Sequence, residues 1–262
     1  MKALSGKEFA RMLEAQGSAP PHEVGWSAAV EDPMSERVLP TPDAFATCPN
    51  DGKILEYYAG VFEAVFVLLH PFIKAVSIEK DQFVWSTYPG RAKIVSHCVP
   101  VSWAEVASKA ELPSIAAVDI GLRTGILGLK VEYSKQEYAD KIESLAESDQ
   151  ILAPPEGCFS DLLHDKVLQA IQRLGYEWVW VGDEFGTERK LHWIEDLKGN
   201  DSEATSGHCN VFTPDKAVLW TTHWDSHFSF LCSSKRNLAA VQERNQFEGF
   251  FCTESTEVYW SV

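Results

Sequence analysis

The clearest alternation of apolar and polar positions runs from Ala217 to Cys232. Successive residues of a β-strand point to opposite sides, so this stretch presents two faces. One face carries the side chains Val218, Trp220, Thr222, Trp224, Ser226, Phe228, Phe230 and Cys232. The other places His223, Asp225 and His227 in one polar row, with neighbours about 7 Å apart along the strand. The pattern predicts a long strand with a core face and a polar face.

The length of this stretch leaves a second interpretation open. Strands usually contain roughly 3–10 residues, so a strand from 217 to 232 would have to be bent or bulged. A turn at Trp224–His227 would instead make a hairpin, with His223 opposite Phe228, and would dissolve the polar row. We favour the bent strand, because the alternation continues across the suspected turn.

Helical patterns dominate the first two thirds of the chain. The run from Ile54 to Leu69 has apolar residues at helical spacing and predicts a core helix, while Ser160–Leu174 predicts another that ends at Gly175. Alternation over 176–182 and 190–194 predicts a β-hairpin. The fold class is therefore α+β, with a helical N-terminal two thirds packed on a C-terminal antiparallel β-sheet.

Shorter signals refine the helices. Ser102 and Glu105 form a capping-box pattern, and so do Ser134 and Glu137. A helix beginning near Ile115 contains Gly121, which indicates either a break or another helix that packs closely there. The glycine-rich stretch of this helix does not end in the Gly-Lys-Ser/Thr motif of a phosphate loop.

The N-terminal part has a different composition. Residues 5–16 predict a short amphipathic helix, and prolines are frequent from there to about residue 53. We expect residues 1–52 to form an N-terminal helix and a Pro-rich arm, and residues 53–262 to form a single α+β domain.

Composition and net charge disfavour some classes of binding partner. The formal net charge of −15 opposes binding to nucleic acid or to an anionic membrane surface, because such binding relies on Lys and Arg. It suits a basic protein or a metal cation better. The 6 cysteines form no C-x-x-C motif, and the N-terminus has no apolar run of signal-peptide type. We expect a cytoplasmic protein with reduced cysteines.

Three strings carry a resemblance to a known family: residues 182–190 (GDEFGTERK), residues 221–228 (TTHWDSHF) and residues 257–260 (EVYW). They resemble an uncharacterised bacterial family known only as a domain of unknown function. The similarity extends from about residue 45 to the C-terminus. The resemblance implies a bacterial, cytoplasmic protein and supplies no activity.

The polar row supports a metal-site hypothesis. His223, Asp225 and His227 are suitable ligands for a divalent metal such as zinc, Asp183 could complete the set, and Glu184 would act as general base on a bound water. Residues collinear on one strand do not converge on one ion without a bulge. The alternative is a solvated or hydrogen-bonded polar sheet face without a cofactor. The adjacent pairs His97-Cys98 and His208-Cys209 point to opposite faces and form no activated dyad as they stand.

Two hypotheses about function follow. The leading one is a non-enzymatic protein that binds a basic protein, as an inhibitor of the immunity type would; the rival is a metal-dependent hydrolase at the His223, Asp225 and His227 strand face. A separate prediction concerns the core between sheet and helices, which we expect to contain the aromatic residues Trp178, Trp180, Trp220, Trp224, Phe228 and Phe230.

Overall fold

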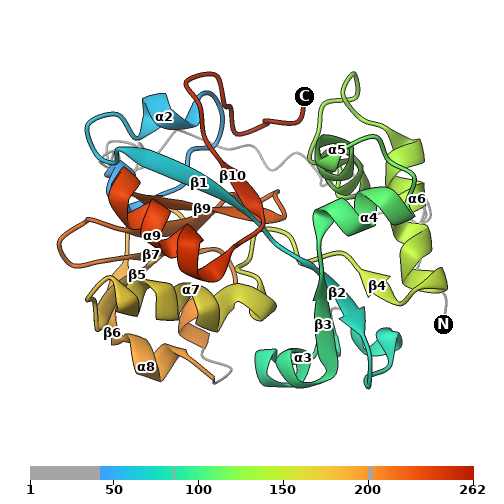
Figure 1. The fold of residues 1–262 in the computed structure, drawn as a ribbon, viewed down its shortest axis with the longest axis horizontal. Coiled ribbons are helices and arrows are strands. Elements are labelled where there is room, and N and C mark those ends of the chain that lie inside the picture. The colour runs from blue at the N-terminus through green and yellow to red at the C-terminus, as the bar shows by residue number, and fades with distance from the viewer. Residues whose placement is uncertain (1–41, 85, 200–202) are drawn as a thin grey trace, which may run out of the picture. The chain divides into compact units, whose positions relative to one another are not determined.

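The computed structural model describes residues 42–84, 86–199 and 203–262, and Pro42–Val262 form one compact unit (Figure 1). The predicted helix at 5–16 and most of the Pro-rich arm lie outside the described residues. Residues 42–52 contribute Phe45 and Ala46 to the main core.

A seven-stranded antiparallel sheet has the order β10-β1-β9-β8-β7-β5-β6. Its strands are β1 (Ala64–Leu69), β5 (Trp178–Asp183), β6 (Arg189–Trp193), β7 (Cys209–Phe212), β8 (Leu219–Thr222), β9 (Phe228–Ser233) and β10 (Gly249–Phe251). A three-stranded sheet of β3 (Cys98–Val101), β2 (Phe72–Ala75) and β4 (Ile151–Leu152) is also antiparallel. The antiparallel mixed fold is confirmed, but strands β1 to β4 interrupt the predicted helical N-terminal part.

The predicted helix from Ile54 to Leu69 is wrong. Only Ile54–Tyr57 is helical (α2), and the chain then enters β1, whose six residues are all buried. A short apolar run is compatible with a buried strand as well as with a helix, and partners on both sides of β1 decide for the strand. His70 and Pro71 then connect β1 directly to β2, so one segment passes from one sheet to the other (Figure 1).

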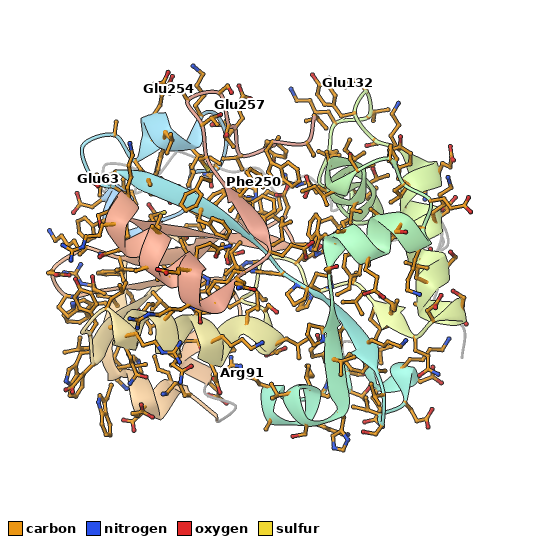
Figure 2. The ribbon with its side chains drawn as sticks, viewed as in Figure 1. Glu63, Arg91, Glu132, Phe250, Glu254 and Glu257 are labelled. Atoms are coloured by element: carbon orange, nitrogen blue, oxygen red, sulfur yellow. The ribbon has the colours of Figure 1, made fainter. Side chains whose placement is uncertain are left out.

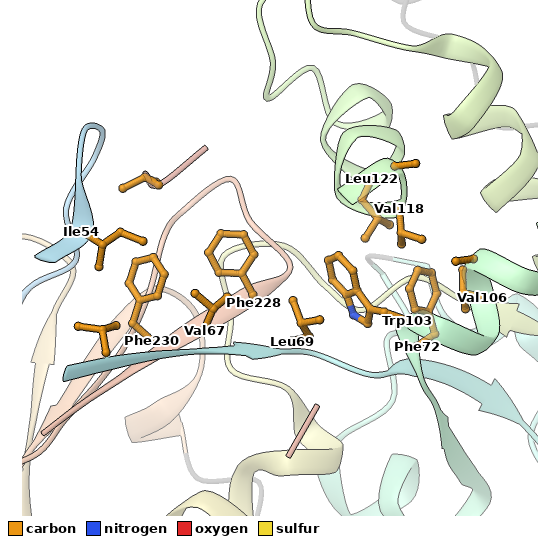
Figure 3. Packing of buried hydrophobic residues seen from close by; sticks show 14 of the residues in the cluster. Ile54, Val67, Leu69, Phe72, Trp103, Val106, Val118, Leu122, Phe228 and Phe230 are labelled. Carbon is orange, nitrogen blue, oxygen red and sulfur yellow. The ribbon is translucent and has the colours of Figure 1, made fainter. Parts of the chain in front are cut away.

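Helices cover both faces of the large sheet. The remaining helices are α3 (Arg91–His97), α4 (Trp103–Lys109), α5 (Ile115–Gly125), α6 (Gln136–Ser148), α7 (Asp161–Arg173), α8 (Ile194–Leu197) and α9 (Lys235–Asn245), with short 3-10 helices η1 (Ala44–Ala46), η2 (Lys80–Gln82) and η3 (Glu203–Thr205). Residues of α7 and α9 share one apolar cluster with one sheet face. The other face packs Phe228 and Phe230 with α2, α4 and α5 (Figure 3). No helix in the described part of the chain is long and apolar enough to cross a membrane.

The predicted capping boxes and the predicted role of Gly121 are confirmed only in part. Ser102 accepts a hydrogen bond from the Glu105 backbone N–H at 3.1 Å and caps α4 as predicted. The second capping box does not form, because α6 begins after Lys135. Helix α5 is unbroken at Gly121, where an added Cβ would lie 2.7 Å from Cδ1 of Ile142 on α6. The glycine therefore allows α6 to pack closely.

The stretch from 217 to 232 is a hairpin, so the favoured single strand is wrong. Trp220 pairs with Leu231 and Thr222 with Ser229, and residues 223–227 form the connection. Because paired residues share a face, Trp220 lies on the α7 side, whereas Phe228 and Phe230 lie on the α4 and α5 side. The alternation continues across the turn although the chain reverses direction there. Both faces of this central hairpin are buried, so alternation does not separate a core face from a polar face.

Candidate functional site

The residues of the predicted polar row lie in the β8–β9 loop and are buried. His223, Asp225 and His227 are 1%, 5% and 3% exposed, while Trp224 between them is 56% exposed. The loop therefore turns its polar side chains inward and its tryptophan outward. A solvated polar sheet face does not exist at these positions.

Both ring nitrogens of His223 have partners within the protein. Nε2 donates to the backbone carbonyl of Asn50 at 2.9 Å, and Nδ1 lies against the Asp225 carboxylate and 3.3 Å from the Asp225 backbone N–H. Burial alone would raise the pKa of Asp225, but the bond to His223 and the nearby Arg123 charge keep it below its ordinary value. In this arrangement both ring nitrogens of His223 are occupied by contacts to Asn50 and Asp225.

Arg123 on α5 is fully buried and contacts the β8–β9 loop. Its Nε lies 3.4 Å from Oδ2 of Asp119 and its Nη1 lies 3.7 Å from Oδ1 of Asp225. Its Nη2 donates to the Val258 carbonyl at 3.2 Å, and the guanidinium stands 4.5 Å from the ring centre of Tyr259. We call Asp119, Arg123, His223 and Asp225 the Arg123 cluster. It joins α5, the hairpin loop and the C-terminal segment.

Arg123 and Asp119 are not among the site residues predicted from the sequence, although their spacing carries a signal. The two residues stand four positions apart, at the spacing of a helical ion pair, within a helix with a strong apolar stripe. Charged residues are almost never fully buried unless they are paired. The spacing identifies the pair, but only the fold adds Asp225 to it.

His227 points to a different neighbourhood from His223. Its Nδ1 donates to the Pro154 carbonyl at 2.8 Å, which leaves Nε2 unprotonated and without a partner among the described residues. Burial lowers the pKa of His227 to about 4 and that of nearby His70 to about 3. Both rings are therefore buried in the neutral form.

Asp183 and Glu184 lie at the end of the β5–β6 hairpin. The Asp183 carboxylate accepts hydrogen bonds from the Thr187 backbone N–H at 2.8 Å and from the Thr187 hydroxyl, so it stabilises the turn. Burial would raise the pKa of Asp183, but these hydrogen bonds outweigh it and lower the value. Glu184 is exposed.

The described residues contain no group of three or more His, Cys, Asp or Glu side chains placed to hold a metal ion. The metal-dependent hydrolase stays a prediction, and the geometry adds no support to it. Of the two His-Cys pairs, His208-Cys209 has an exposed histidine and a buried cysteine, and burial raises the pKa of Cys209 to about 12. Burial also raises the pKa of Cys98 in the pair His97-Cys98. A thiol of that kind is not activated as a nucleophile.

An exposed aromatic face on β5 and β6 is the second feature of interest. Trp178 pairs with Trp193 and Trp180 with Leu191, so these four side chains share one side of the sheet. Trp178, Leu191 and Trp193 are 48%, 40% and 43% exposed. We call these four residues the aromatic face. Its exposure corrects the prediction that Trp178 belongs to the core, and the same prediction is wrong for the exposed Trp224. Trp220, Phe228 and Phe230 are buried as predicted.

The aromatic face ends at the edge of the sheet. Among the described strands, none pairs with the outer side of β6. Toward the sheet interior, Arg189 stands 5.2 Å from the ring centre of Trp180 and 5.9 Å from that of Phe212. Phe185 at the hairpin turn is also 65% exposed. Apolar surface and an open strand edge therefore coincide.

Comparison with known proteins gives one match. Searches of curated proteins and of solved structures found nothing similar to this chain. The family model described as "Protein of unknown function (DUF2711)" matches residues 50–262, which include the Arg123 cluster and the aromatic face. This chain therefore belongs to the DUF2711 family.

Proposed function

We propose that this chain acts by binding a basic protein and that the aromatic face is its docking surface. The observation that carries the proposal is the solvent exposure of Trp178, Leu191 and Trp193 on one side of an edge hairpin. Isolated apolar side chains at a surface need no explanation, but adjacent ones mark interaction sites. Tryptophan is also the residue type most enriched among the dominant contacts of protein interfaces.

Charge supports a basic partner. The formal net charge is −15, and residues 176–199 contain six acidic residues against three basic ones. Exposed carboxylates also lie elsewhere on the surface, among them Glu63, Glu132, Glu254 and Glu257 (Figure 2). Such a charge distribution accelerates association with a cation-rich surface and makes the rate sensitive to salt. An acidic inhibitor of the immunity type fits this description.

The hairpin offers two means of attachment to such a partner. The aromatic face can pack against an apolar centre on the partner, with Lys and Arg of the partner at its rim facing exposed carboxylates of the hairpin turn such as Glu184. The open edge of β6 can accept an added strand by backbone hydrogen bonds. Both features belong to the same five residues, Arg189–Trp193, and their immediate neighbours.

Site-specific photo-crosslinking tests the proposal. A photoreactive phenylalanine analogue replaces Trp193 in one variant and Phe251 in the other; Phe251 is an equally exposed aromatic on β10, the opposite edge strand. In the native cell, the probe at 193 should capture one basic protein that the probe at 251 does not capture. Capture of the same proteins at both positions, of nothing at 193, or of a second copy of this chain would overturn the proposal.

The captured protein then allows a quantitative test. Titration calorimetry with the purified partner should show that Trp178→Ala and Trp193→Ala each weaken binding about thirtyfold or more, because a central tryptophan contributes about 2 kcal/mol or more. Phe251→Ala should leave the affinity unchanged. Raising the salt concentration should slow association more than it speeds dissociation. Equal losses for all three variants would place the interface elsewhere.

A further inference from the structure

A pocket of about 460 Å³ lies between the start of α3 and the segment that leads into α7. Figure 2 shows Arg91 between these two helices. Most of the lining is apolar, and Tyr88, Pro89, Pro155 and Phe159 contribute to it. The volume is within the range of small-molecule sites. None of the described lining residues belongs to the aromatic face or to the Arg123 cluster.

The apolar walls are held in place by packing behind them. The Phe159 ring is stacked on the buried Trp220 ring, at 3.6 Å between ring centres and 20° between ring planes. Tyr88 packs edge-on against Phe83 at 5.6 Å between ring centres. Aromatic side chains favour offset or edge-on contacts with other aromatic rings. A planar ring in the pocket would therefore meet aromatic walls that are already fixed.

The charged pair in the lining, Arg91 and Asp161, is bound within the protein. Arg91 is only 8% exposed, its Nε lies 3.3 Å from Oδ1 of Asp161, and its Nη2 donates to the Thr205 hydroxyl at 3.4 Å. Thr205 is itself buried, and its hydroxyl lies 2.9 Å from Nε2 of His164. Arg91 and Asp161 both have further interactions within the chain. The pair therefore stabilises the pocket, and ligand recognition falls to the apolar walls and the rim.

The described lining has an excess of negative charge. Two carboxylates, Asp161 and Glu203, stand against one cation, Arg91, and Glu203 of η3 is exposed at the rim. Burial raises the pKa of Tyr88 and that of Cys158, and the negative charge of Asp161 raises both further. The phenol and the thiol therefore remain uncharged, and both lie in the field of a carboxylate. A negatively charged ligand would be repelled here, whereas a positive charge would be attracted to Glu203.

We propose that this pocket binds a small ligand with a planar aromatic ring and no negative charge, and that aromatic amines are the class that matches it best. The ring packs against Tyr88 and Phe159. The amino group lies at the rim, where Glu203 and water accept its hydrogen bonds. An aromatic carboxylate offers the same ring but places its charge beside the carboxylate of Glu203.

Three indole derivatives of similar size test this assignment: tryptamine is a cation, tryptophol is uncharged and indole-3-acetate is an anion. Ligand-observed NMR should detect binding of tryptamine and of tryptophol in the millimolar range, which is ordinary for ligands of this size. Indole-3-acetate should bind at least about fivefold more weakly than tryptamine. Failure of either tryptamine or tryptophol to bind up to about 10 mM, or equal binding of indole-3-acetate and tryptamine, overturns the proposal.

A charge variant separates the effect of the rim from that of the net charge of the protein. Glu203→Gln removes the rim carboxylate and should lower the preference for tryptamine over indole-3-acetate at least about threefold. Glu132→Gln removes an exposed carboxylate outside the pocket and changes the net charge by the same amount, so the preference should stay as in the wild type. An unchanged preference in Glu203→Gln, or an equal change in both variants, contradicts the proposal.

Variants of the walls locate the ring. Tyr88→Ala removes an aromatic wall and should weaken tryptophol binding at least about fivefold, whereas Tyr88→Phe keeps the ring and should bind tryptophol as the wild type does. Ser206→Trp fills the rim and should weaken tryptophol binding by a similar factor, whereas Ser144→Trp on α6 should not. Thermal melts establish that all four variants are folded. Tryptophol binding that is unchanged in either Tyr88→Ala or Ser206→Trp contradicts the assignment. None of these measurements involves the crosslinking partner, so the two proposals succeed or fail separately.

Discussion

The Arg123 cluster is buried although its residues are polar or charged, and the aromatic face is exposed although its residues are apolar. Charged side chains are sealed beneath the β8–β9 loop, while three large apolar side chains of β5 and β6 meet solvent. His223 and Asp225 of the cluster and all residues of the aromatic face come from stretches with clear alternation. Alternation separates the two faces of a strand but does not tell which face is covered. What differs between the regions is the number of elements that pack on them.

Removal of Arg123 should have the largest effect on the buried side of this comparison. Arg123→Met leaves Asp119 and Asp225 buried without their cation, and breaking a buried ion pair costs about 3–5 kcal/mol of unfolding free energy. Urea denaturation measures the loss. Arg189→Met, at an exposed arginine, serves as control and should cost less than about 1 kcal/mol.

A rescue variant distinguishes lost charge compensation from lost packing. Arg123→Met combined with Asp119→Asn and Asp225→Asn removes the uncompensated charges and should recover part of the loss. A loss below about 1 kcal/mol in Arg123→Met alone would mean that water reaches the cluster. The contrast with the aromatic face would then disappear.

A truncation of Trp220 tests the packing of the apolar core on the same hairpin. It is fully buried, stacks on Phe159 and donates its indole N–H to the Ser229 hydroxyl at 2.9 Å. Trp220→Ala should therefore lower the unfolding free energy by about 3–5 kcal/mol in denaturant melts. A similar loss is expected for Phe230→Ala on the opposite face. A small loss in either variant would mean that the cavity collapses or that the residue is not packed as described.

The buried histidines predict an acid-sensitive fold. Burial lowers the pKa of His70 to about 3 and that of His227 to about 4, whereas both return to about 6.5 on unfolding. The unfolded chain therefore binds more protons than the folded chain below pH 6.5. The contribution of the neutral buried histidines to the unfolding free energy is complete above pH 6.5 and is lost as the pH falls toward 4. At pH 5 each histidine should cost roughly 2 kcal/mol of stability.

Histidine variants test the source of this pH dependence. His227→Gln removes the titrating ring, so the unfolding free energy should fall less steeply between pH 6.5 and 5 than in the wild type. His208→Gln, at an exposed histidine, should follow the wild-type curve. If the two variants give the same slope, His227 is protonated in the folded state as easily as in the unfolded one.

Elements with complete local signals could be predicted from the sequence. Helix α7 has an apolar stripe and Gly175 just beyond its end, and the β5–β6 hairpin alternates with a turn between its strands. Ser102 caps α4 with the spacing of the motif. In each of these cases, neighbouring residues contain the information that determines the element.

Features that depend on distant segments could not be predicted in this way. The second part of the run from Ile54 to Leu69 becomes strand β1 because β9 and β10 flank it from the other end of the chain. The hairpin at 223–227 reverses the face of every later residue, so Trp220 and Phe228 separate. The Arg123 cluster draws on α5, the hairpin loop and residues 258–261. No single stretch of sequence contains that combination.

Trp193 should give the smallest change in stability and thereby sharpen the comparison most. Its side chain is 43% exposed and pairs with Trp178 across the hairpin, so Trp193→Ala removes less buried surface than Trp220→Ala. The unfolding free energy should change by less than about 1 kcal/mol, far below the loss for Trp220→Ala. A tryptophan that is dispensable for folding but required for partner binding would explain its place on an open edge. If Trp193→Ala instead destabilises the fold as strongly as Trp220→Ala, the aromatic face is a part of the core, and no docking surface remains on β5 and β6.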